Sequence, residues 1–383
     1  MSGVGDFQDG SLRFSHKLRQ IHWGMIFLLC LIAGIGVAML YSAGNASFSP
    51  WAGRQAVRFA VGLAVLFAVG LTGIRFWLRH AYTIYGVSLF LLIIVGFTGI
   101  VGMGAQRWLD LGYFQVQPSE VVKITLVLAL ARYFHGASLE DVSRPGFLML
   151  PFLMLVFPAL LVLRQPDLGT ALMLIIGGLS VFFLAGVRIW KFALLIGGTL
   201  ATMPFLWMGL HGYQKRRILV FLDPGSDPLG AGYHILQSQI ALGSGGLLGK
   251  GFLQGTQAHL NFLPEKQTDF IFTMLAEEFG IAGGLLLLGL YLLLAFCGFM
   301  ISLRSRNQFG RLLGMGLTVT FSLYFFVNIA MVTGLIPVVG VPLPLISYGG
   351  TALLMLLFAF GLLMSIHIHR DVRLGRRGRD DDG

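Results

Sequence analysis

Charged residues are scarce in this chain. Lysine, arginine, aspartate and glutamate make up 11% of its 383 residues, whereas hydrophobic residues make up 56% and the mean hydropathy is +0.80. A soluble domain needs a far more polar surface to stay in water. The scarcity of charge therefore excludes an ordinary soluble globular protein and indicates that a lipid bilayer surrounds most of the chain.

Cysteine and metal-binding patterns are also lacking. Cys30 and Cys297 lie inside apolar runs, where a thiol behaves as a small hydrophobic group, so we expect no disulfide. The nine histidines lack the spacing of zinc ligands, and we predict no metal site, although a need for a divalent cation stays open. The glycine-rich run 243–251 lacks the spacing of a phosphate-binding loop, and no Ser or Thr follows Lys250. ATP chemistry is not indicated.

Long apolar runs recur along the whole chain, each of roughly 17 to 25 residues, which is enough to cross a bilayer as a helix. This pattern predicts an all-α polytopic membrane protein with about ten transmembrane helices. The first run is too long for the core of a signal peptide, and the eighth is longer than a perpendicular crossing needs, so we expect it to tilt or to project. The predicted spans are 22–42, 56–74, 81–103, 117–135, 147–163, 168–186, 189–208, 271–302, 311–334 and 347–368.

Basic residues gather at alternate ends of these predicted helices, which is typical of cytoplasmic loops. This pattern predicts a cytoplasmic segment 1–21, a transmembrane domain 22–368 and a cytoplasmic, disordered tail 369–383. The long connection of about 209–270 is then an extracytoplasmic loop, and its apolar stretches favour partial helix at the membrane interface. The net charge of +10 thus reports topology and contact with membrane lipid, and nucleic acid is not an expected partner.

Ionisable residues at the outer ends of the helices are the first candidates for a functional site, because charge is costly in a membrane. Arg107 and Trp108 precede a predicted helix in which Glu120 and Lys123 are three residues apart and share one face. They can form an ion pair that orients helices, or they can contact substrate directly. Asp167 lies in a tight turn between two helices, where it can cap the second helix or support a site through a buried salt bridge.

The long connection carries a second group of candidates. Clustered cations suit a diphosphate group, because guanidinium and ammonium groups match phosphate oxygens, but they also attract anionic lipid headgroups without specificity. These residues are Arg216, Arg217, Lys250 and Lys266.

Asp269 stands where this polar connection enters a long apolar run. The start of a helix favours an ionised carboxylate, whereas partial burial raises its proton affinity. These opposed effects can poise Asp269 as a general base. A helix-terminal charge with no other role is the alternative.

Several motifs, taken in their order along residues 20–368, resemble the SEDS family of shape, elongation, division and sporulation proteins. They are Gln117–Glu120 with Lys123, Gln165–Thr170, Phe221–Pro224, Ser226–His234, Gln237–Ser238, Leu263–Glu265, Thr268–Phe270 and Pro342–Gly350. Each motif is weak alone, but the ordered set is specific. Within the family the chain is most similar to the elongation branch, RodA, rather than to the division branch, FtsW. It departs from the family at Gln267, where a histidine is usual.

The resemblance implies a peptidoglycan glycosyltransferase of the bacterial cytoplasmic (inner) membrane that polymerises lipid II during cell elongation. It implies two kinds of partner, a class B penicillin-binding transpeptidase and elongation proteins of the MreC and MreD type. Asp269 matches a family motif and is the expected catalytic residue. The expected substrate-binding residues are Arg107, Trp108, Glu120, Lys123, Asp167, Arg216, Arg217, Lys250, Glu265, Lys266 and Ser347.

The implied reaction agrees with the candidate residues. A sugar hydroxyl attacks the anomeric carbon of a lipid-linked donor, with inversion, and undecaprenyl diphosphate leaves. Such a reaction needs one base and cations near the leaving group, but no general acid. Two other classes of function stay open: a lipid II flippase or transporter, since polar groups in a helix bundle suit a transport path, and a non-catalytic scaffold of the elongation complex.

Overall fold

The computed structural model describes most of the chain. The described residues are 14–102, 105–110, 112, 115–209, 212–223, 225, 231–259, 265–372 and 374–375. The helices are α1 Phe14–Arg19, α2 Trp23–Ala43, α3 Ala52–Leu71, α4 Ile74–Thr98, α5 Pro118–His135, α6 Leu139–Ser143, α7 Pro145–Arg164, α8 Leu168–Leu184, α9 Ile189–Gly209, α10 Gly212–Leu222, α11 Ala231–Ser244, α12 Thr256–His259, α13 Ile271–Arg304, α14 Gln308–Val332 and α15 Gly350–Ile368.

Ten of the described helices account for the predicted crossings. Seven are long and apolar enough to span a membrane: α2, α3, α4, α7, α13, α14 and α15. Two shorter apolar helices, α8 and the stretch Ile189–Phe205 of α9, add two more. The tenth is α5, an 18-residue helix that carries Glu120, Lys123 and Arg132. The prediction of an all-helical polytopic membrane protein is confirmed.

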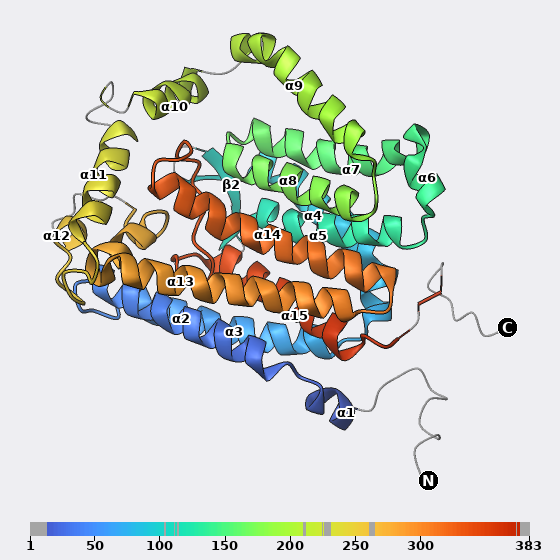
Figure 1. The fold of residues 1–383 in the computed structure, drawn as a ribbon, viewed down its shortest axis with the longest axis horizontal. Helices are drawn as coiled ribbons and strands as arrows, with labels where there is room; N and C mark the ends of the chain where they lie inside the picture. The colour runs from blue at the N-terminus through green and yellow to red at the C-terminus, as the bar shows by residue number, and fades with distance from the viewer. Residues whose placement is uncertain are drawn as a thin grey trace.

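The bundle is organised around α5, which contacts α4, α7, α8, α14 and α15. Most α5 side chains are buried, whereas α9 is largely exposed and lies over one side of the bundle (Figure 1). Exposed apolar side chains such as Phe97, Phe205 and Met208 suit a surface that faces lipid. Polar groups on α5 are therefore shielded from lipid by neighbouring helices.

Three short strands interrupt the helical pattern on the connection from α4 to α5. They are β1 Ile100–Gly102, β2 Ala105–Asp110 and β3 Gln115–Val116, paired antiparallel in the order β1-β2-β3. The predicted span 81–103 is wrong at both ends, because α4 begins at Ile74 with Arg75 and Arg79 in its first turns and ends at Thr98. The predicted span left out these first turns because they are charged. A hydropathy pattern cannot distinguish a helix end that extends beyond the bilayer from a loop.

Gly280 divides α13 into two parts. Its φ of +67° is non-helical, and a Cβ at this position would lie 2.4 Å from the backbone nitrogen of Gly249. A Cβ at Gly249 would likewise lie 2.1 Å from the carbonyl oxygen of Glu278. The run that we expect to tilt or to project is thus bent at Gly280. The glycine-rich run serves close backbone packing against the bend, since only glycine tolerates these approaches.

The long connection between α9 and α13 is partly helical, as predicted, and contains α10, α11 and α12. Of these helices, α11 packs against α13 and α14. In Figure 1, α11 and α12 lie at one end of the bundle, and α1 lies near the other end. The start of α2 meets the end of α15, where the backbone nitrogen of His22 lies 3.3 Å from Sδ of Met364.

The described start of the C-terminal tail packs against the loop between α13 and α14. The backbone nitrogen of Arg306 donates to the carbonyl oxygen of Arg370 at 3.0 Å, and Nδ2 of Asn307 donates to that of Val372 at 3.3 Å. These described residues of the segment 369–383, which we expected to be disordered, hold defined contacts. Residues 373 and 376–383 lie outside the described part.

Candidate functional site

Glu120 and Lys123 form the ion pair that their spacing predicted. Nζ of Lys123 lies 2.7 Å from Oε1 of Glu120, and both side chains are almost fully buried. Tyr324 on α14 contacts both members of the pair. Its hydroxyl donates to Oε2 of Glu120 at 2.5 Å, and its ring centroid lies 4.3 Å from Nζ of Lys123. The two charges are thus compensated within the bundle, where isolated charges would be costly.

Asp167 fills both structural roles that the sequence left open. Oδ1 accepts a hydrogen bond from the backbone nitrogen of Thr170 at 3.0 Å, which caps α8. Oδ2 lies 3.5 Å from Nη1 of Arg107 and 3.5 Å from Nε2 of Gln117, which donates to it. Arg107 also donates to the carbonyl oxygen of Gln165 at 2.9 Å. Arg107, on β2 next to Trp108, therefore ties the small sheet to the turn before α8.

Glu265 organises the turn that precedes α13. Its Oε2 accepts hydrogen bonds from Oγ1 of Thr268 at 3.0 Å and from Nε2 of Gln267 at 3.3 Å. Its carbonyl oxygen accepts from the backbone nitrogen of Thr268 at 3.0 Å. Asp269 follows at the end of this turn and is partly exposed. The predicted substrate-binding residue Glu265 thus also shapes the loop that carries Asp269.

The connection between α14 and α15 lies against this turn. A Cβ at Gly340 would lie 3.5 Å from Oδ2 of Asp269, and a Cβ at Gly169, in the first turn of α8, would lie 2.6 Å from the carbonyl oxygen of Val339. Asp269 and the start of α8, which Asp167 caps, therefore meet the same short segment. Two of the predicted site residues, Asp167 and Asp269, are therefore brought together by this segment.

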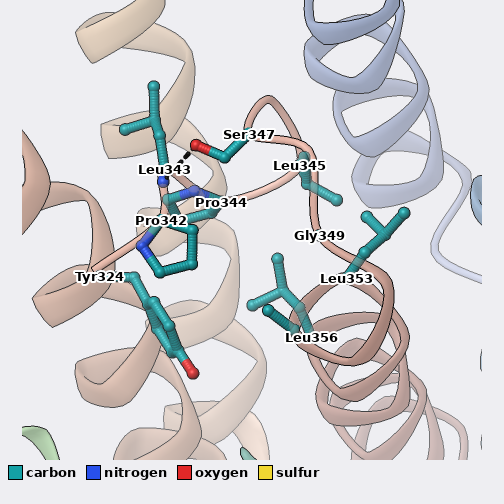
Figure 2. Close-up of a pocket in the computed structure, with 10 residues that line it drawn as sticks. Tyr324, Pro342, Leu343, Pro344, Leu345, Ser347, Gly349, Leu353 and Leu356 are labelled. Carbon is teal, nitrogen blue, oxygen red and sulfur yellow. Dashed lines mark hydrogen bonds between the residues drawn. The ribbon is translucent and has the colours of Figure 1, made fainter. Parts of the chain in front are cut away.

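Ser347 is buried in this connection, and its hydroxyl already has partners within the protein. Oγ donates to the carbonyl oxygen of Thr268 at 2.6 Å and accepts from the backbone nitrogen of Leu343 at 2.7 Å. Figure 2 shows Ser347 turned toward Leu343, with Tyr324 below. These residues and Leu353 and Leu356 of α15 line a small cavity of about 20 Å³. These contacts favour a structural role for Ser347 in the turn.

Two cations lie close to the Asp269 turn. Lys266 is buried, and this burial lowers the pKa of its ammonium group below the ordinary value. Arg58 on α3 stacks over the ring of Tyr348, with Cζ 4.6 Å from the ring centroid. The backbone nitrogen of Tyr348 in turn donates to the carbonyl oxygen of Gln267 at 2.8 Å. Arg58 was not among the predicted site residues. The signal for it was a polar pair, Gln55 and Arg58, one helical turn apart in an apolar run.

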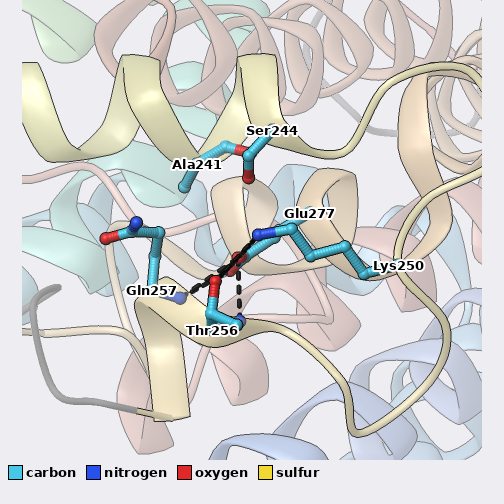
Figure 3. A network of polar contacts seen from close by, with 6 residues as sticks. All are labelled: Ala241, Ser244, Lys250, Thr256, Gln257 and Glu277. Atoms are coloured by element: carbon cyan, nitrogen blue, oxygen red, sulfur yellow. Dashed lines mark hydrogen bonds and ion pairs between the residues drawn. The ribbon is translucent and has the colours of Figure 1, made fainter.

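Lys250 belongs to a separate network centred on Glu277 (Figure 3). Its Nζ lies 2.6 Å from Oε1 of Glu277, a fully buried side chain on the first part of α13. The same carboxylate accepts from the backbone nitrogens of Thr256 at 2.8 Å and Gln257 at 3.1 Å. The ammonium group of Lys250 therefore compensates a buried carboxylate. Glu277 was missed, although two adjacent acidic residues inside an apolar run are a signal for a functional or structural cluster.

The remaining candidates are only partly described. Arg216 and Arg217 lie on α10, and their side chains are outside the described part of the structure. Among the residues that the structure describes, no three His, Cys, Asp or Glu side chains are grouped so that they could hold a metal ion.

The fold and the site together define a class: a polytopic membrane protein whose ionisable side chains gather at helix ends, with Asp167 before α8 and with Lys266 and Asp269 before α13. A family model described as cell cycle protein, for FtsW, RodA and SpoVE, matches residues 21–372. This chain belongs to that family, the SEDS proteins.

Individual relatives agree with this assignment. The chain is 51% identical over 277 residues to the peptidoglycan glycosyltransferase MrdB of Escherichia coli (strain K12), covering 70% of this chain and 73% of that relative. A solved structure described as the structural coordination of polymerization and crosslinking by a peptidoglycan synthase complex matches with TM-score 0.80 and 34% identity over 91% and 98% of the two chains. The Thermus thermophilus rod shape determining protein RodA matches with TM-score 0.70 and 31% identity over 92% and 98%.

Proposed function

We propose that this chain is a peptidoglycan glycosyltransferase that polymerises lipid II into glycan strands during cell elongation, with Asp269 as its general base. The enzyme class is that of the relative with 51% identity. The observation that carries the role of Asp269 is its place: a partly exposed carboxylate at the start of α13, on a turn held by Glu265 and by the connection that contains Ser347. Binding and catalytic groups commonly lie on loops that a rigid scaffold positions.

The proposed reaction breaks one bond and forms one. The acceptor sugar hydroxyl gives its proton to Asp269 as its oxygen attacks the anomeric carbon of the donor, and the bond from that carbon to the diphosphate oxygen breaks with inversion. The diphosphate leaves as an anion, so no proton is supplied to it. Cations near the leaving oxygen stabilise the negative charge that develops there.

The residues divide into two roles under this proposal. Lys266, Arg216 and Arg217 bind the diphosphate and lipid headgroup, and Arg107 and Trp108 border the site on β2. The other predicted residues position these groups rather than contact substrate. Glu120 with Lys123, Asp167, Lys250, Glu265 and Ser347 each have protein partners that account for their polar side chains.

Partners and topology complete the proposal. A solved relative is described as coordinating polymerization and crosslinking in a peptidoglycan synthase complex, which supports a class B penicillin-binding transpeptidase as partner, alongside MreC and MreD type proteins. An even number of crossings supports two termini on one side of the bacterial inner membrane, and the basic residues on that side indicate the cytoplasm. A cysteine introduced at Ser226, in a chain without Cys30 and Cys297, should react with an impermeant thiol reagent in intact spheroplasts. Labelling only after lysis would overturn this topology.

Replacement of Asp269 tests the catalytic proposal. Asp269→Asn keeps the size of the side chain but removes its basic site, so glycan synthesis from purified lipid II should fall by roughly a hundredfold or more, while membrane expression and co-purification with the transpeptidase persist. Asp110→Asn is the matched control, because Asp110 is an exposed outer carboxylate. Near wild-type synthesis by Asp269→Asn would reduce Asp269 to a helix-terminal charge. A wild-type chain that yields no polymer in detergent would favour a flippase or scaffold.

A further inference from the structure

Three consecutive carbonyl groups before α13 are each held by a hydrogen bond from the α14 and α15 side of the bundle. The donors to the carbonyl oxygens of residues 267, 268 and 269 are, in that order, the backbone nitrogen of Tyr348 at 2.8 Å, Oγ of Ser347 at 2.6 Å and Nδ2 of Asn328 at 3.0 Å. Two of these three donors are side chains. The backbone of the Asp269 turn is therefore fixed by identifiable residues on other helices and loops.

Asn328 is an unusual residue for its place. It lies fully buried within α14, and its Nδ2 donates to the carbonyl oxygens of both Asp269 and Val341, at 3.0 and 2.7 Å. Its Oδ1 has no hydrogen-bond partner among the described residues. The opposite amide orientation would place this oxygen against two carbonyl oxygens, so the orientation follows from the contacts. A buried amide that leaves its own oxygen unpaired calls for an explanation beyond packing.

Ser347 extends the same arrangement to α3. Its hydroxyl joins Thr268 to Leu343, and its own carbonyl oxygen accepts from Nε2 of Gln55 at 3.0 Å. Gln55 is itself buried. Since its one proton is donated within the protein, the hydroxyl has no proton left to donate to another partner.

We propose that Asn328 and Ser347 are positioning residues that hold the backbone of residues 267–269 so that the Asp269 carboxylate meets the acceptor hydroxyl. This inference rests on the proposed role of Asp269. A catalytic group on a turn keeps its geometry only when the surrounding residues hold that turn, and a displacement of about 1 Å can cost on the order of a hundredfold in rate.

Alanine variants with matched controls test the proposal. Asn328→Ala and Ser347→Ala should lower kcat for glycan synthesis by about 10- to 100-fold, with KM for lipid II changed less than about twofold. The controls remove similar buried hydrogen bonds far from Asp269: Ser365→Ala, whose Oγ donates to the carbonyl oxygen of Thr72 at 2.7 Å, and Asn307→Ala, whose Nδ2 donates to Val372. They should lower Tm to a similar degree and leave kcat within about twofold. Equal losses of kcat in variants and controls would overturn the proposal.

A conservative variant guards against misfolding. Ser347→Thr keeps the hydroxyl, and the cavity of about 20 Å³ beside Ser347 offers room for part of the added methyl group. It should retain most of the activity that Ser347→Ala loses. If Asn328→Ala does not fold, the Ser347→Ala and Ser347→Thr pair decides alone, and equal kcat for these two would reject the hydroxyl as a positioning group.

A double variant separates this proposal from the proposed function. When Asn328→Ala is added to Asp269→Asn, the residual rate should stay the same, because the positioned base is already gone. A further fall of the same size as in the wild-type background would mean that Asn328 acts independently of Asp269, and the positioning role would be lost. An active Asp269→Asn single variant would instead remove the catalytic role of Asp269 itself.

Discussion

Two ion pairs of glutamate and lysine have nearly the same nitrogen–oxygen distance but different surroundings. Glu120 and Lys123 lie 2.7 Å apart within α5, with 5% and 2% of their side chains exposed. Glu277 and Lys250 lie 2.6 Å apart and join α13 to the long connection that precedes it, and Lys250 keeps 27% of its side chain exposed. The first pair neutralises charge inside the bundle, whereas the second fastens a connection to the bent start of α13.

The neighbours of the two carboxylates show the same contrast. Oε2 of Glu120 is held by the Tyr324 hydroxyl, a side chain on another transmembrane helix. Glu277 is held by backbone nitrogens of Thr256 and Gln257. Loss of Glu120 would thus strand a charge away from water, while loss of Glu277 would release a loop whose lysine can still be hydrated.

The largest effect is expected at the pair inside the bundle. Glu120→Ala leaves the Lys123 ammonium buried without its carboxylate, which should destabilise the protein by about 3–5 kcal/mol. Thermal unfolding in detergent, followed by intrinsic fluorescence, measures the change. The double variant Glu120→Ala with Lys123→Met should recover part of the loss, since no charge is stranded. Purely additive losses across this cycle would contradict a coupled pair.

A smaller and more local effect is expected at Glu277. Glu277→Ala removes the charged acceptor of the part-buried hydrogen bonds from the backbone nitrogens of Thr256 and Gln257, at a cost of about 1.5–3 kcal/mol. Limited proteolysis should cut the connection of residues 250–259 faster than in the wild type, because that segment loses its anchor. Glu277→Gln keeps one acceptor oxygen and should show an intermediate cutting rate. Unchanged proteolysis of Glu277→Ala would show that other contacts hold the connection.

Lys266 provides the smallest expected effect and extends the comparison to a third lysine. Burial lowers the pKa of its ammonium group, so Lys266 loses its proton at a lower pH than an exposed lysine does. If its charge binds the diphosphate, the rate of glycan synthesis should fall a few-fold as pH rises through this lowered pKa. Lys266→Arg stays protonated and should keep its activity further into alkaline solution. If the rate fell at the same alkaline pH in the wild type and in Lys266→Arg, the charge of Lys266 would have no role in substrate binding.

Local patterns predicted much of the fold. The predicted spans 117–135, 168–186 and 347–368 coincide with α5, α8 and α15 to within three residues, because each begins at a polar boundary that is followed by a mostly apolar run. The span predicted for α4 was shifted toward the C-terminus because the first turns of this helix are charged. The three strands were missed because each is short, and because strand pairing joins residues whose proximity a single run does not reveal.

The candidate site shows the same division. The spacing of Glu120 and Lys123 on one helix face predicted their ion pair, and the order of polar residues in the turn predicted Asp167 as the cap of α8. Glu277, Arg58 and Asn328 were not predicted as site residues. Each is a single polar residue or doublet in an apolar run, and its partners come from segments far along the chain.

The sequence by itself determined that the chain crosses a membrane about ten times, which family it belongs to, and that Asp269 begins a long apolar helix. These are properties of composition and of neighbouring residues, which the bilayer enforces because it admits only apolar helices of sufficient length. Only the tertiary structure decided what holds Asp269 in place. Asn328 lies 59 residues beyond Asp269, and Ser347 lies 79 residues beyond Thr268. Such contacts depend on how α3, α13, α14 and α15 pack, because a hydrogen bond forms only where packing brings donor and acceptor within about 3 Å.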